Sequence, residues 1–389
     1  MCGGSESASV YKQRFQGIAE VALLHGYDVC VCKGCGCGFA DRIPSQEEFD
    51  AYYRDSSKYE NPNREGQEST YDSTTYDTVV DLIEHLVPDK RSLLVDIGCA
   101  TGGLLAAFKR RAFENLLGID PSPGCAAAAA RIHGIKVVSG TLNRLPELDP
   151  SADFVLLTGV LEHVRDVTSL LAKACSILAP TGRIHVAVPD VTKFTEWPNA
   201  PFQHFSIEHI NFFSPRSLSN LFGVAGFRNV FLRQVGREQN FATVEPIIHA
   251  TFERDNGGKH RWQIDEQTGP ALQAYVEQCR RAQTEEISVI DRLVASAEPI
   301  VVWGVGTHSQ RLLATTGLSR ANIRAFVDSN PKYQGKALVG RPIITPSDLK
   351  TRSEALLISS WMYQQEIEEQ ITKVLKLRNK VIKLHCLQS

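Results

Sequence analysis

Two imidazoles and one carboxylate occur within six residues of each other in an aromatic stretch of the sequence, Phe202–Ser214. They belong to His204, Glu208 and His209. A neighbouring carboxylate makes an imidazole more basic, so this group is suited to accept a proton at neutral pH. Two interpretations stay open: a general base, for which we expect His209, or loop histidines that bind backbone carbonyls.

A fourth candidate, His163, follows the apolar run FVLLTGV, which predicts a buried strand. In a doubly wound α/β fold, ligands bind beyond the carboxyl ends of the parallel strands. His163 would lie on that rim and could act on a ligand there. The alternative is that Glu162 and His163 only cap or pack the helix that follows.

A glycine-rich turn follows another predicted strand, in the sequence LLVDIGCATGG over residues 93–103. Gly98 and Gly102 let the backbone approach a ligand and adopt turn dihedrals that other residues resist. Asp120 ends the next predicted strand, 18 residues after Gly102. A doubly wound fold places the carboxylate that binds ribose hydroxyls at about this distance.

The spacing of the turn separates two kinds of ligand. A dinucleotide turn has the pattern G-x-G-x-x-G and cradles a pyrophosphate. Here the pattern is D-x-G-x-x-x-G, with Asp96 at its start. That carboxylate would repel pyrophosphate and attract the ammonium or sulphonium group of S-adenosylmethionine. We therefore expect S-adenosylmethionine here, and a dinucleotide enzyme or a fold that has lost its cofactor are the alternatives.

Methyl transfer from a sulphonium is an in-line displacement, so the protein mainly aligns donor and acceptor. A base is needed only where the acceptor must lose a proton. Two tyrosines, Tyr71 and Tyr76, precede the first predicted helix of this region. They could close over the site and contact the substrate, or they could simply pack there.

Closely spaced cysteines near the start of the chain predict a metal site. The sequence CKGCG at residues 32–36 is a knuckle of the kind that presents two thiolates to tetrahedral zinc. Cys2 looks like half of a second knuckle, and Cys30 or Cys37 would supply the last thiolate. A metal-free remnant and a redox pair are the alternatives. The predicted ligands of a structural zinc are Cys2, Cys32, Cys35 and Cys37.

A second strand, glycine turn and helix begin at Pro299, with the sequence VVWGVGTHS. Gly304 and Gly306 form the turn, and Asp328 follows Gly306 by 22 residues. Ser309 stands where a dinucleotide turn has its third glycine, so the pattern is weak evidence for that ligand. The turn and the helix N-terminus could still hold a phosphate of a nucleotide-linked substrate. The alternative is a packing domain without a ligand.

Charge and hydropathy exclude several classes of partner. The 389 residues include 42 basic and 44 acidic side chains, for a net charge of −2. Such a chain has no bulk attraction to nucleic acid or anionic lipid, so neither partner is expected. No apolar run approaches the roughly 20 residues of a membrane helix. The first residues lack the basic and apolar parts of a secretion signal, so we expect a cytoplasmic protein.

The elements that would position these residues fall into four regions. A Cys-rich segment covers 1–55, and 56–250 alternates apolar runs with helical patterns, which predicts a parallel sheet covered on both faces. Residues 251–298 combine a polar linker, 251–270, with an amphipathic helix. A second α/β unit covers 299–389.

The spacing D-x-G-x-x-x-G resembles the first motif of class I methyltransferases, and LAPTGRIHVAVPD resembles their fifth strand with its Pro-x-Gly turn. With the order of its regions, the chain resembles the three-domain, S-adenosylmethionine-dependent sugar C-methyltransferases that act on nucleotide-linked deoxysugars. The resemblance implies an α/β fold: a class I methyltransferase Rossmann-like domain, a small N-terminal zinc-binding segment, and a second C-terminal Rossmann-like domain that helps hold the nucleotide.

The resemblance also implies roles for single residues. His163 corresponds to the histidine after the fourth strand, and Glu208 and His209 to the Glu-His pair that manages the proton on the methylated carbon. The donor site would comprise Asp96, Gly98, Cys99, Gly102, Asp120, Thr141, Leu142 and Thr158. The substrate site would comprise Tyr71, Tyr76, Gly304, Gly306 and Asp328.

Three positions depart from that family. Ser206 replaces a tyrosine, Gly159 replaces an asparagine, and the His-Gly-Gly-Ser loop appears only as 235–238, VGRE. Removing a proton from carbon needs that network, whereas methylating a hydroxyl needs less. We predict methylation of a sugar, expected to be nucleotide-linked, at carbon or oxygen. O- or N-methylation of a small natural product, with a purely structural C-terminal domain, is the alternative, and a non-catalytic scaffold ranks last.

Overall fold

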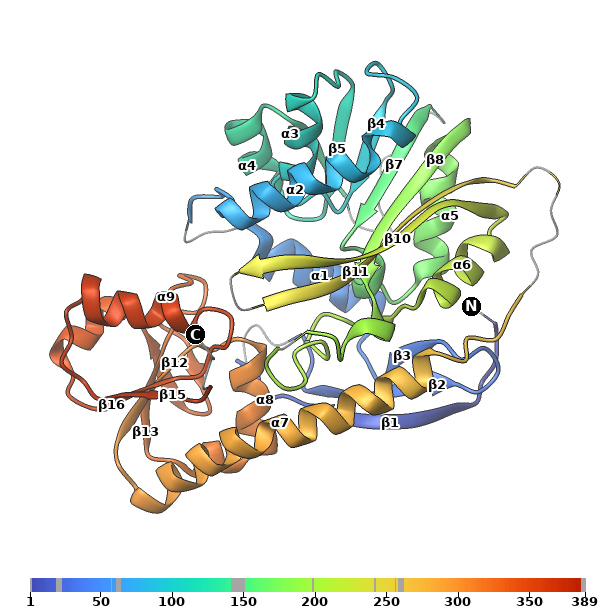
Figure 1. Cartoon of the computed structure of the whole chain (residues 1–389). Helices are drawn as coiled ribbons and strands as arrows, with labels where there is room; N and C mark the ends of the chain where they lie inside the picture. Colours follow the sequence, from blue (N-terminus) through green and yellow to red (C-terminus); the bar gives the residue numbers. More distant parts are fainter. Residues whose placement is uncertain are drawn as a thin grey trace.

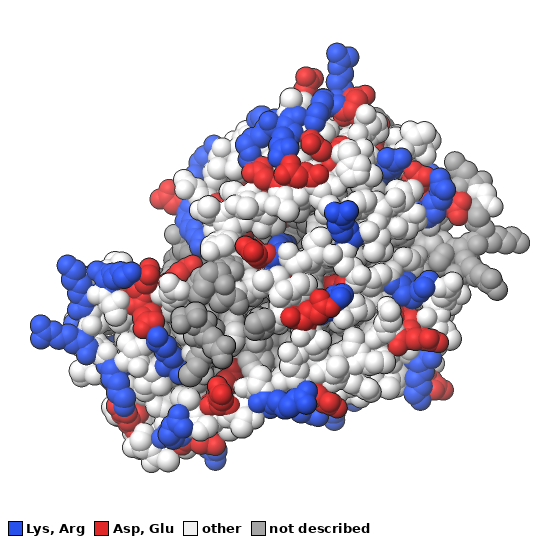
Figure 2. Space-filling model, viewed as in Figure 1, with Lys and Arg blue, Asp and Glu red and all other residues white. Residues whose placement is uncertain are grey.

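The computed structural model describes residues 2–18, 23–56, 58–60, 64–140, 151–197, 199–240, 243–255, 257 and 262–385. Three β-sheets organise the chain, and one long helix runs past two of them (Figure 1). Among the described residues, no helix is long and apolar enough to cross a membrane. On the face drawn in Figure 2, acidic and basic side chains lie interspersed.

The first sheet has the order β1-β2-β3-β9, and all its pairs are antiparallel. Its last strand comes from a distant part of the sequence, because Gly38 and Phe39 pair with Phe212 and Asn211. The segment that carries Glu208 and His209 is thereby fixed against the N-terminal sheet. The elements are β1 Ser7–Arg14, β2 Gly26–Cys32, β3 Gly38–Asp41, α1 Gln46–Ser56 and β9 Asn211–Phe212.

The central sheet has the order β10-β11-β8-β7-β4-β5-β6. The five strands from β8 to β6 are parallel, as predicted. The chain runs outward from β4 to β6 and then returns to β7 on the other side of β4, so a topological switch point lies between β4 and β7. The strands are β4 Leu94–Ile97, β5 Leu116–Asp120, β6 Lys136–Ser139, β7 Ala152–Thr158, β8 Leu178–Pro189, β10 Phe227–Asn240 and β11 Thr243–Arg254.

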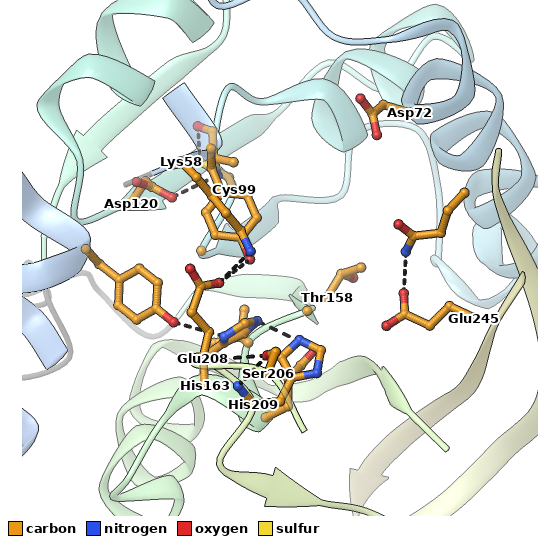
Figure 3. A pocket seen from close by; sticks show the side chains of 18 of the residues that line it. Lys58, Asp72, Cys99, Asp120, Thr158, His163, Ser206, Glu208, His209 and Glu245 are labelled. Carbon is orange, nitrogen blue, oxygen red and sulfur yellow. Dashed lines mark hydrogen bonds and ion pairs between the residues drawn. The ribbon is translucent and has the colours of Figure 1, made fainter. Parts of the chain in front are cut away.

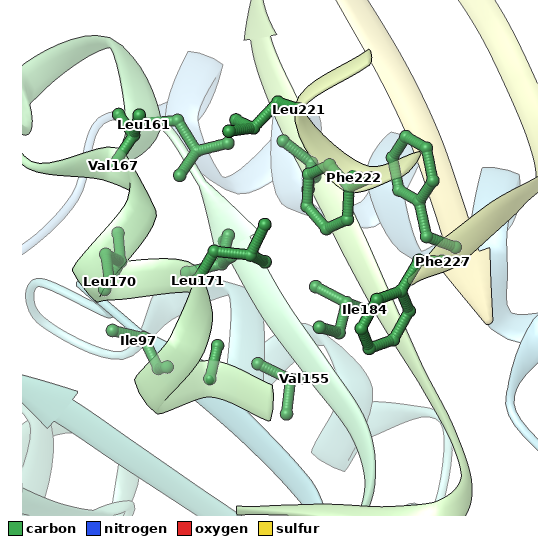
Figure 4. Close-up of a cluster of buried hydrophobic side chains, with 14 of the residues drawn as sticks. Ile97, Val155, Leu161, Val167, Leu170, Leu171, Ile184, Leu221, Phe222 and Phe227 are labelled. Atoms are coloured by element: carbon green, nitrogen blue, oxygen red, sulfur yellow. The ribbon is translucent and has the colours of Figure 1, made fainter. Parts of the chain in front are cut away.

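Alternate side chains of the central strands enter two cores. Val95 and Val155 belong to one cluster with α5 and α6 (Figure 4), and their neighbours Leu94 and Phe154 belong to another with α2 and α3. This alternation buries both faces of the sheet, as expected for parallel strands covered by helices. The helices are α2 Thr70–Ile83, α3 Gly103–Arg110, α4 Pro123–His133, α5 Val167–Ile177 and α6 Pro215–Val224.

Helix α7, Thr268–Ser296, connects two parts of the molecule. Its first half buries Leu272 and Val276 in the core of the N-terminal sheet, and its second half buries Ile290 and Leu293 in the core of the C-terminal unit. At 29 residues it is about 43 Å long, enough to contact both (Figure 1).

The C-terminal sheet has the order β14-β15-β13-β12-β16-β17, and every pair except β14 with β15 is parallel. The alternating strands and helices predicted for this region are therefore present. The elements are β12 Ile300–Trp303, α8 Thr307–Thr315, β13 Ile323–Val327, β14 Ala337–Leu338, β15 Arg341–Ile344, β16 Ala355–Ile358, α9 Gln364–Glu369 and β17 Val381–Lys383.

Two expectations about the chain were wrong. The central sheet is not wholly parallel, because β10 and β11 form an antiparallel hairpin that joins β8 at its edge. The predicted linker 251–270 begins inside β11 and ends inside α7. The start of the predicted linker belongs to β11 because the buried ring of Phe252 stacks on Phe222 at 3.9 Å and holds the strand in the sheet.

Candidate active site

A cavity of about 690 Å³ opens beyond the carboxyl ends of β4 and β7 (Figure 3). It is lined by side chains from the N-terminal region, the central sheet and the C-terminal unit. Representative lining residues are Tyr52, Tyr53, Lys58, Asp96, Asp120, Thr158, His163, His204, Glu208, His209, Gly306 and Tyr333. The three histidines and the glutamate predicted as catalytic thus lie in one cavity.

The glycine turn after β4 forms one end of this cavity. Gly98 has a φ of +78°, and a Cβ there would lie 2.7 Å from Cγ2 of Val160. Asp120 supports the turn: its Oδ2 accepts the backbone N–H of Ala100 at 2.8 Å, and its Oδ1 accepts that of Ser122 at 2.9 Å. The backbone is therefore held close to any ligand in the cavity, which only glycine at position 98 permits.

Three carboxylates make this end acidic. Burial, and then the nearby Asp120, raise the pKa of Asp96 well above its usual range. Burial likewise raises the pKa of Asp120 to about 6 and is the main cause of the raised pKa of Glu68. Among the described residues, Asp96 and Asp120 have no ion-pair partner, and buried carboxylates of this kind gain most from a bound cation, so this end suits a positively charged ligand.

Glu208 is the centre of a second group of ionisable side chains. It is 1% exposed, and its Oε2 lies 2.7 Å from Nζ of Lys58. The hydroxyls of Tyr52 and Tyr59 donate hydrogen bonds to its two oxygens at 3.0 and 3.3 Å. Burial alone would raise the pKa of Glu208, but Lys58 and His163 hold it at about 2. Glu208 is therefore an anion, and a poor proton acceptor.

His163 and His209 lie edge to face beside Glu208, with ring centres 4.9 Å apart (Figure 3). Nδ1 of His163 and the hydroxyl of Tyr53 are 2.9 Å apart. Burial, and then His209, lower the pKa of His163 to about 3, and burial lowers that of His209 as well. Both imidazoles are thus neutral near pH 7, and the low pKa of His163 makes it a weak base.

His204 is in a more enclosed position. Its ring stacks on Phe194 at 4.0 Å, and its backbone N–H donates to the hydroxyl of Tyr275 at 3.1 Å. Burial lowers its pKa to about 4. The aromatic stack fixes this ring in place at the wall of the cavity.

Two family models match the chain. One, described as "Methyltransferase domain", covers residues 71–232, and the other, "C-methyltransferase C-terminal domain", covers residues 261–384. The first includes the glycine turn, Asp120 and the histidines described above. The chain carries a class I methyltransferase domain. The match of residues 71–232 supports the predicted class of enzyme, and a methyltransferase domain is consistent with the predicted donor, S-adenosylmethionine.

Two curated relatives are similar to part of the chain. A ubiquinone biosynthesis O-methyltransferase of Azorhizobium caulinodans is 35% identical over 113 residues, which are 26% of this chain and 44% of that protein. A probable S-adenosylmethionine-dependent methyltransferase of Mycolicibacterium smegmatis is 28% identical over 138 residues, 34% of this chain and 51% of that protein. The chain thus spans about half the length, or less, of these curated relatives.

Solved structures resemble a little over half of the chain. The 1,6-didemethyltoxoflavin N1-methyltransferase of Burkholderia thailandensis, solved with S-adenosylhomocysteine, has a TM-score of 0.41 and 19% identity, and covers 56% of this chain and 96% of its own. The [4+2]-cyclase SpnF has a TM-score of 0.44 and 17% identity, and covers 55% of this chain and 98% of its own.

Some of the residues predicted to bind the methyl donor line the cavity, and others do not. Asp96, Gly98, Cys99, Asp120 and Thr158 line the cavity. The buried hydroxyl of Thr158 has no hydrogen-bond partner among the described residues. Gly102 is not a lining residue but the N-terminal cap of α3, with a φ of +81°. Thr141 and Leu142 lie outside the described residues.

The residues predicted to bind the substrate are more dispersed. Tyr71 and Tyr76 line the cavity, but they belong to α2 and do not precede the first helix. Gly306 also lines it, whereas Gly304 and Asp328 are not among its lining residues. Asp328 is instead occupied by the backbone: its Oδ2 accepts the N–H of Val305 at 3.1 Å.

Several residues of the cavity were missed from the sequence. Glu162, which was interpreted as a possible helix cap, lines the cavity, and burial raises its pKa to about 8. Its buried Oε2 has no hydrogen-bond partner within the described part of the chain. Arg237 of β10 forms an ion pair with Glu245 of β11. Lys58 lies in a polar stretch of sequence and was not predicted as a site residue. The contacts of Lys58 cross about 150 residues of sequence, so no local pattern could have predicted them.

The cysteine cluster agrees in part with the prediction. Thiols of Cys2, Cys32 and Cys35 lie within 4.8 Å of one another, and those of Cys2 and Cys32 are 3.5 Å apart. Tetrahedral zinc with bonds of about 2.3 Å needs sulfur atoms about 3.8 Å apart, so the three thiols fit zinc. Cys37 is not in this group; its thiol interacts with Cys35 and is the main cause of the raised pKa of that residue.

Proposed function

We propose that the protein methylates a nucleotide-linked sugar at carbon, with S-adenosylmethionine as donor. One observation carries the proposal: the cavity that contains the donor turn is also lined by Gly306 and Thr307, at the glycine turn of the C-terminal unit. A single ligand can therefore contact the methyl donor at one end and a second nucleotide-type turn at the other. The match of residues 261–384 to a C-methyltransferase domain favours carbon over oxygen.

We infer that the acidic end binds the donor. Asp96 and Glu68 would attract its ammonium group, Asp120 its ribose hydroxyls, and the free hydroxyl of Thr158 a further polar atom. The remaining proposed contacts are Gly98, Cys99, Gly102, Thr141 and Leu142. When bound, S-adenosylmethionine supplies a methyl group on a sulphonium.

His209 is our proposed general base. It is neutral, lines the cavity and lies against the ring of His163, which the Tyr53 hydroxyl contacts. A proton taken by His209 from the sugar carbon leaves an imidazolium that the carboxylate of Glu208 stabilises. Lys58, paired with Glu208, would supply a positive charge to stabilise an enolate oxygen. His204 supports the wall of the site, and Tyr71 and Tyr76 contact the substrate.

The other parts of the chain follow from this arrangement. We propose that residues 1–55 form a zinc-binding segment, 56–250 the methyltransferase domain, 251–298 a connecting segment with α7, and 299–389 a Rossmann-like domain that holds the nucleotide. Cys2, Cys32 and Cys35 would bind a structural zinc, with Cys37 or Cys30 moving in as the last ligand. Metal analysis of the purified chain tests the zinc.

Product analysis tests the function. The chain is incubated with isotope-labelled S-adenosylmethionine and a panel of thymidine- and uridine-diphosphate sugars, and mass spectrometry locates the label. We expect label on a sugar carbon. Label on oxygen would overturn carbon methylation, and no labelled sugar, with labelled small aromatic acceptors instead, would favour the O- or N-methyltransferase alternative.

A matched pair of variants tests the role of the C-terminal turn. Gly306 has a φ of −69°, and a Cβ there would meet no atom within 4 Å. Gly306→Asp therefore adds a negative charge without strain, and Gly306→Ala is its neutral control. We expect Gly306→Asp to raise the KM for the nucleotide sugar at least about tenfold by repelling its phosphates. Equal KM values for both variants would make the C-terminal unit structural only.

A further inference from the structure

A further group of ionisable side chains lies where α7, α8 and the end of β17 meet, outside the lining of the active-site cavity. It consists of Glu286 on α7, His308 on α8, and His385, two residues after β17. Their side chains are 2%, 7% and 2% exposed. None of the three lines the cavity or takes part in the proposed mechanism.

The three side chains point polar atoms at one another. Oε1 of Glu286 lies 3.2 Å from Nε2 of His308 and 3.4 Å from Nδ1 of His385. One atom from each residue can be chosen so that all three lie within 4.8 Å of one another. A tetrahedral ion with nitrogen and oxygen bonds of about 2.0–2.1 Å requires ligand atoms about 3.3–3.4 Å apart. Two of the three separations already have that length.

These atoms lack the hydrogen bonds that burial normally demands. Among the described residues, Oε1 of Glu286, both ring nitrogens of His308 and Nε2 of His385 have no hydrogen-bond partner. Buried polar atoms are almost always paired, and a group of unpaired ones needs an explanation such as an ion. A cation bound by Oε1 of Glu286, Nε2 of His308 and Nδ1 of His385 would satisfy the first two of these atoms, which lack partners.

Arg311 fixes the orientation of the carboxylate. Its guanidinium binds the other oxygen, Oε2 of Glu286, at 3.2 Å, and Oε1 of Gln283 at 3.2 Å. Oε1 of Glu286 is thereby left facing the imidazoles, as in metal sites whose ligands are held by outer hydrogen bonds. The positive charge of Arg311 also weakens the attraction for a cation, so the ion should exchange with a chelator.

We propose that Glu286, His308 and His385 bind one divalent transition-metal ion, zinc for this nitrogen and oxygen donor set, with water as the fourth ligand. The ion would join α7 to the start of α8 and to the end of the last strand. Because α8 begins at Thr307, which lines the cavity, the ion would also hold the C-terminal turn in position.

Metal stoichiometry tests the site independently of any activity. The full chain is stripped with a chelator, loaded with zinc, desalted and measured by mass spectrometry for metal content. We expect His308→Asn and Glu286→Gln each to lose one equivalent of zinc per chain relative to wild type. The exposed His25 provides the control, and His25→Asn should lose none. Unchanged stoichiometry in folded His308→Asn and Glu286→Gln would overturn the proposal.

A second measurement uses the unaltered chain, in case the variants do not fold. Crystals of the wild-type protein soaked in zinc are measured at the zinc absorption edge. We expect an anomalous peak between Glu286, His308 and His385, separate from any peak at the cysteines. Density for zinc elsewhere but none here would overturn the proposal and show a metal-free ion network. Neither measurement depends on the substrate, so the proposed function can fail without affecting this result.

Discussion

The two glycine turns of the chain have the same backbone arrangement and different chemistry. In both, the first glycine donates its N–H to the residue before the key aspartate: Gly98 to Ile119 at 2.7 Å and Gly304 to Val327 at 2.8 Å. In both, that aspartate accepts one N–H from the turn and one from two residues further along the chain. Asp120 and Asp328 thus have equivalent structural roles.

The difference lies two residues before the first glycine. The first turn has Asp96 there, and the second has the buried Val302. Asp120 reaches the cavity, whereas Asp328 is not a lining residue. One turn therefore presents carboxylates, which suit a cationic donor, and the other presents only backbone and Thr307, which suit a phosphate. A shared fold unit does not specify its ligand; the side chains around it do.

The largest effect is expected from a substitution that distorts only the first glycine turn. Gly98→Ala forces a side chain into a φ of +78° and against Val160. We expect the free energy of unfolding to fall by about 1–3 kcal/mol, and donor binding to be lost in calorimetry. Gly306→Ala, at the second turn, should change the free energy of unfolding by less than about 0.5 kcal/mol. Similar losses in both variants would contradict the contrast between the turns.

An intermediate effect is expected from the charge of the first turn. Asp96→Asn keeps the shape of the side chain and removes the carboxylate. Because a charged hydrogen bond contributes about 1.5–3 kcal/mol, we expect the Kd for S-adenosylmethionine to rise about 10- to 100-fold. Binding of a nucleoside diphosphate should stay the same. If both ligands weaken equally, Asp96 acts on folding and not on the donor.

The smallest effect is a pH dependence that only the first turn should show. Since the pKa of Asp120 is raised to about 6, this group is protonated in the ligand-free protein below that pH. The donor favours the ionised form, so its affinity should fall as pH drops through 6, by at most about tenfold per pH unit. Calorimetry at pH 5, 6 and 7 measures this, and Asp120→Asn should reduce the dependence, because Asp96, whose pKa burial also raises, still titrates. A flat profile for wild type would contradict the assignment of Asp120.

The sequence predicted features that depend on neighbours along the chain. The strands around Asp96, Asp120 and Thr158 were correct because each is a short apolar run ended by a turn residue. His163 and His209 both line the cavity, and each follows or precedes a recognisable strand or motif. Local patterns thus identified the glycine turn and two histidines of the cavity.

Features that depend on distant contacts were missed. Lys58 and Tyr52 meet Glu208 across 150 and 156 residues, and no spacing in the sequence connects them. The ion pair of Arg237 with Glu245 depends on the antiparallel hairpin β10–β11. The alternating strands and helices earlier in the region predicted only parallel strands, so this hairpin was not expected. The cationic side chains of Lys58 and Arg237 near the cavity were therefore found only in the folded structure.

The most direct test is simultaneous binding of the two ligands to the full chain. S-adenosylhomocysteine is added to saturation, and thymidine or uridine diphosphate is then titrated by calorimetry. The account predicts one site for each ligand per chain, both occupied together in one cavity. Saturable binding of S-adenosylhomocysteine with no heat from any nucleoside diphosphate would contradict it.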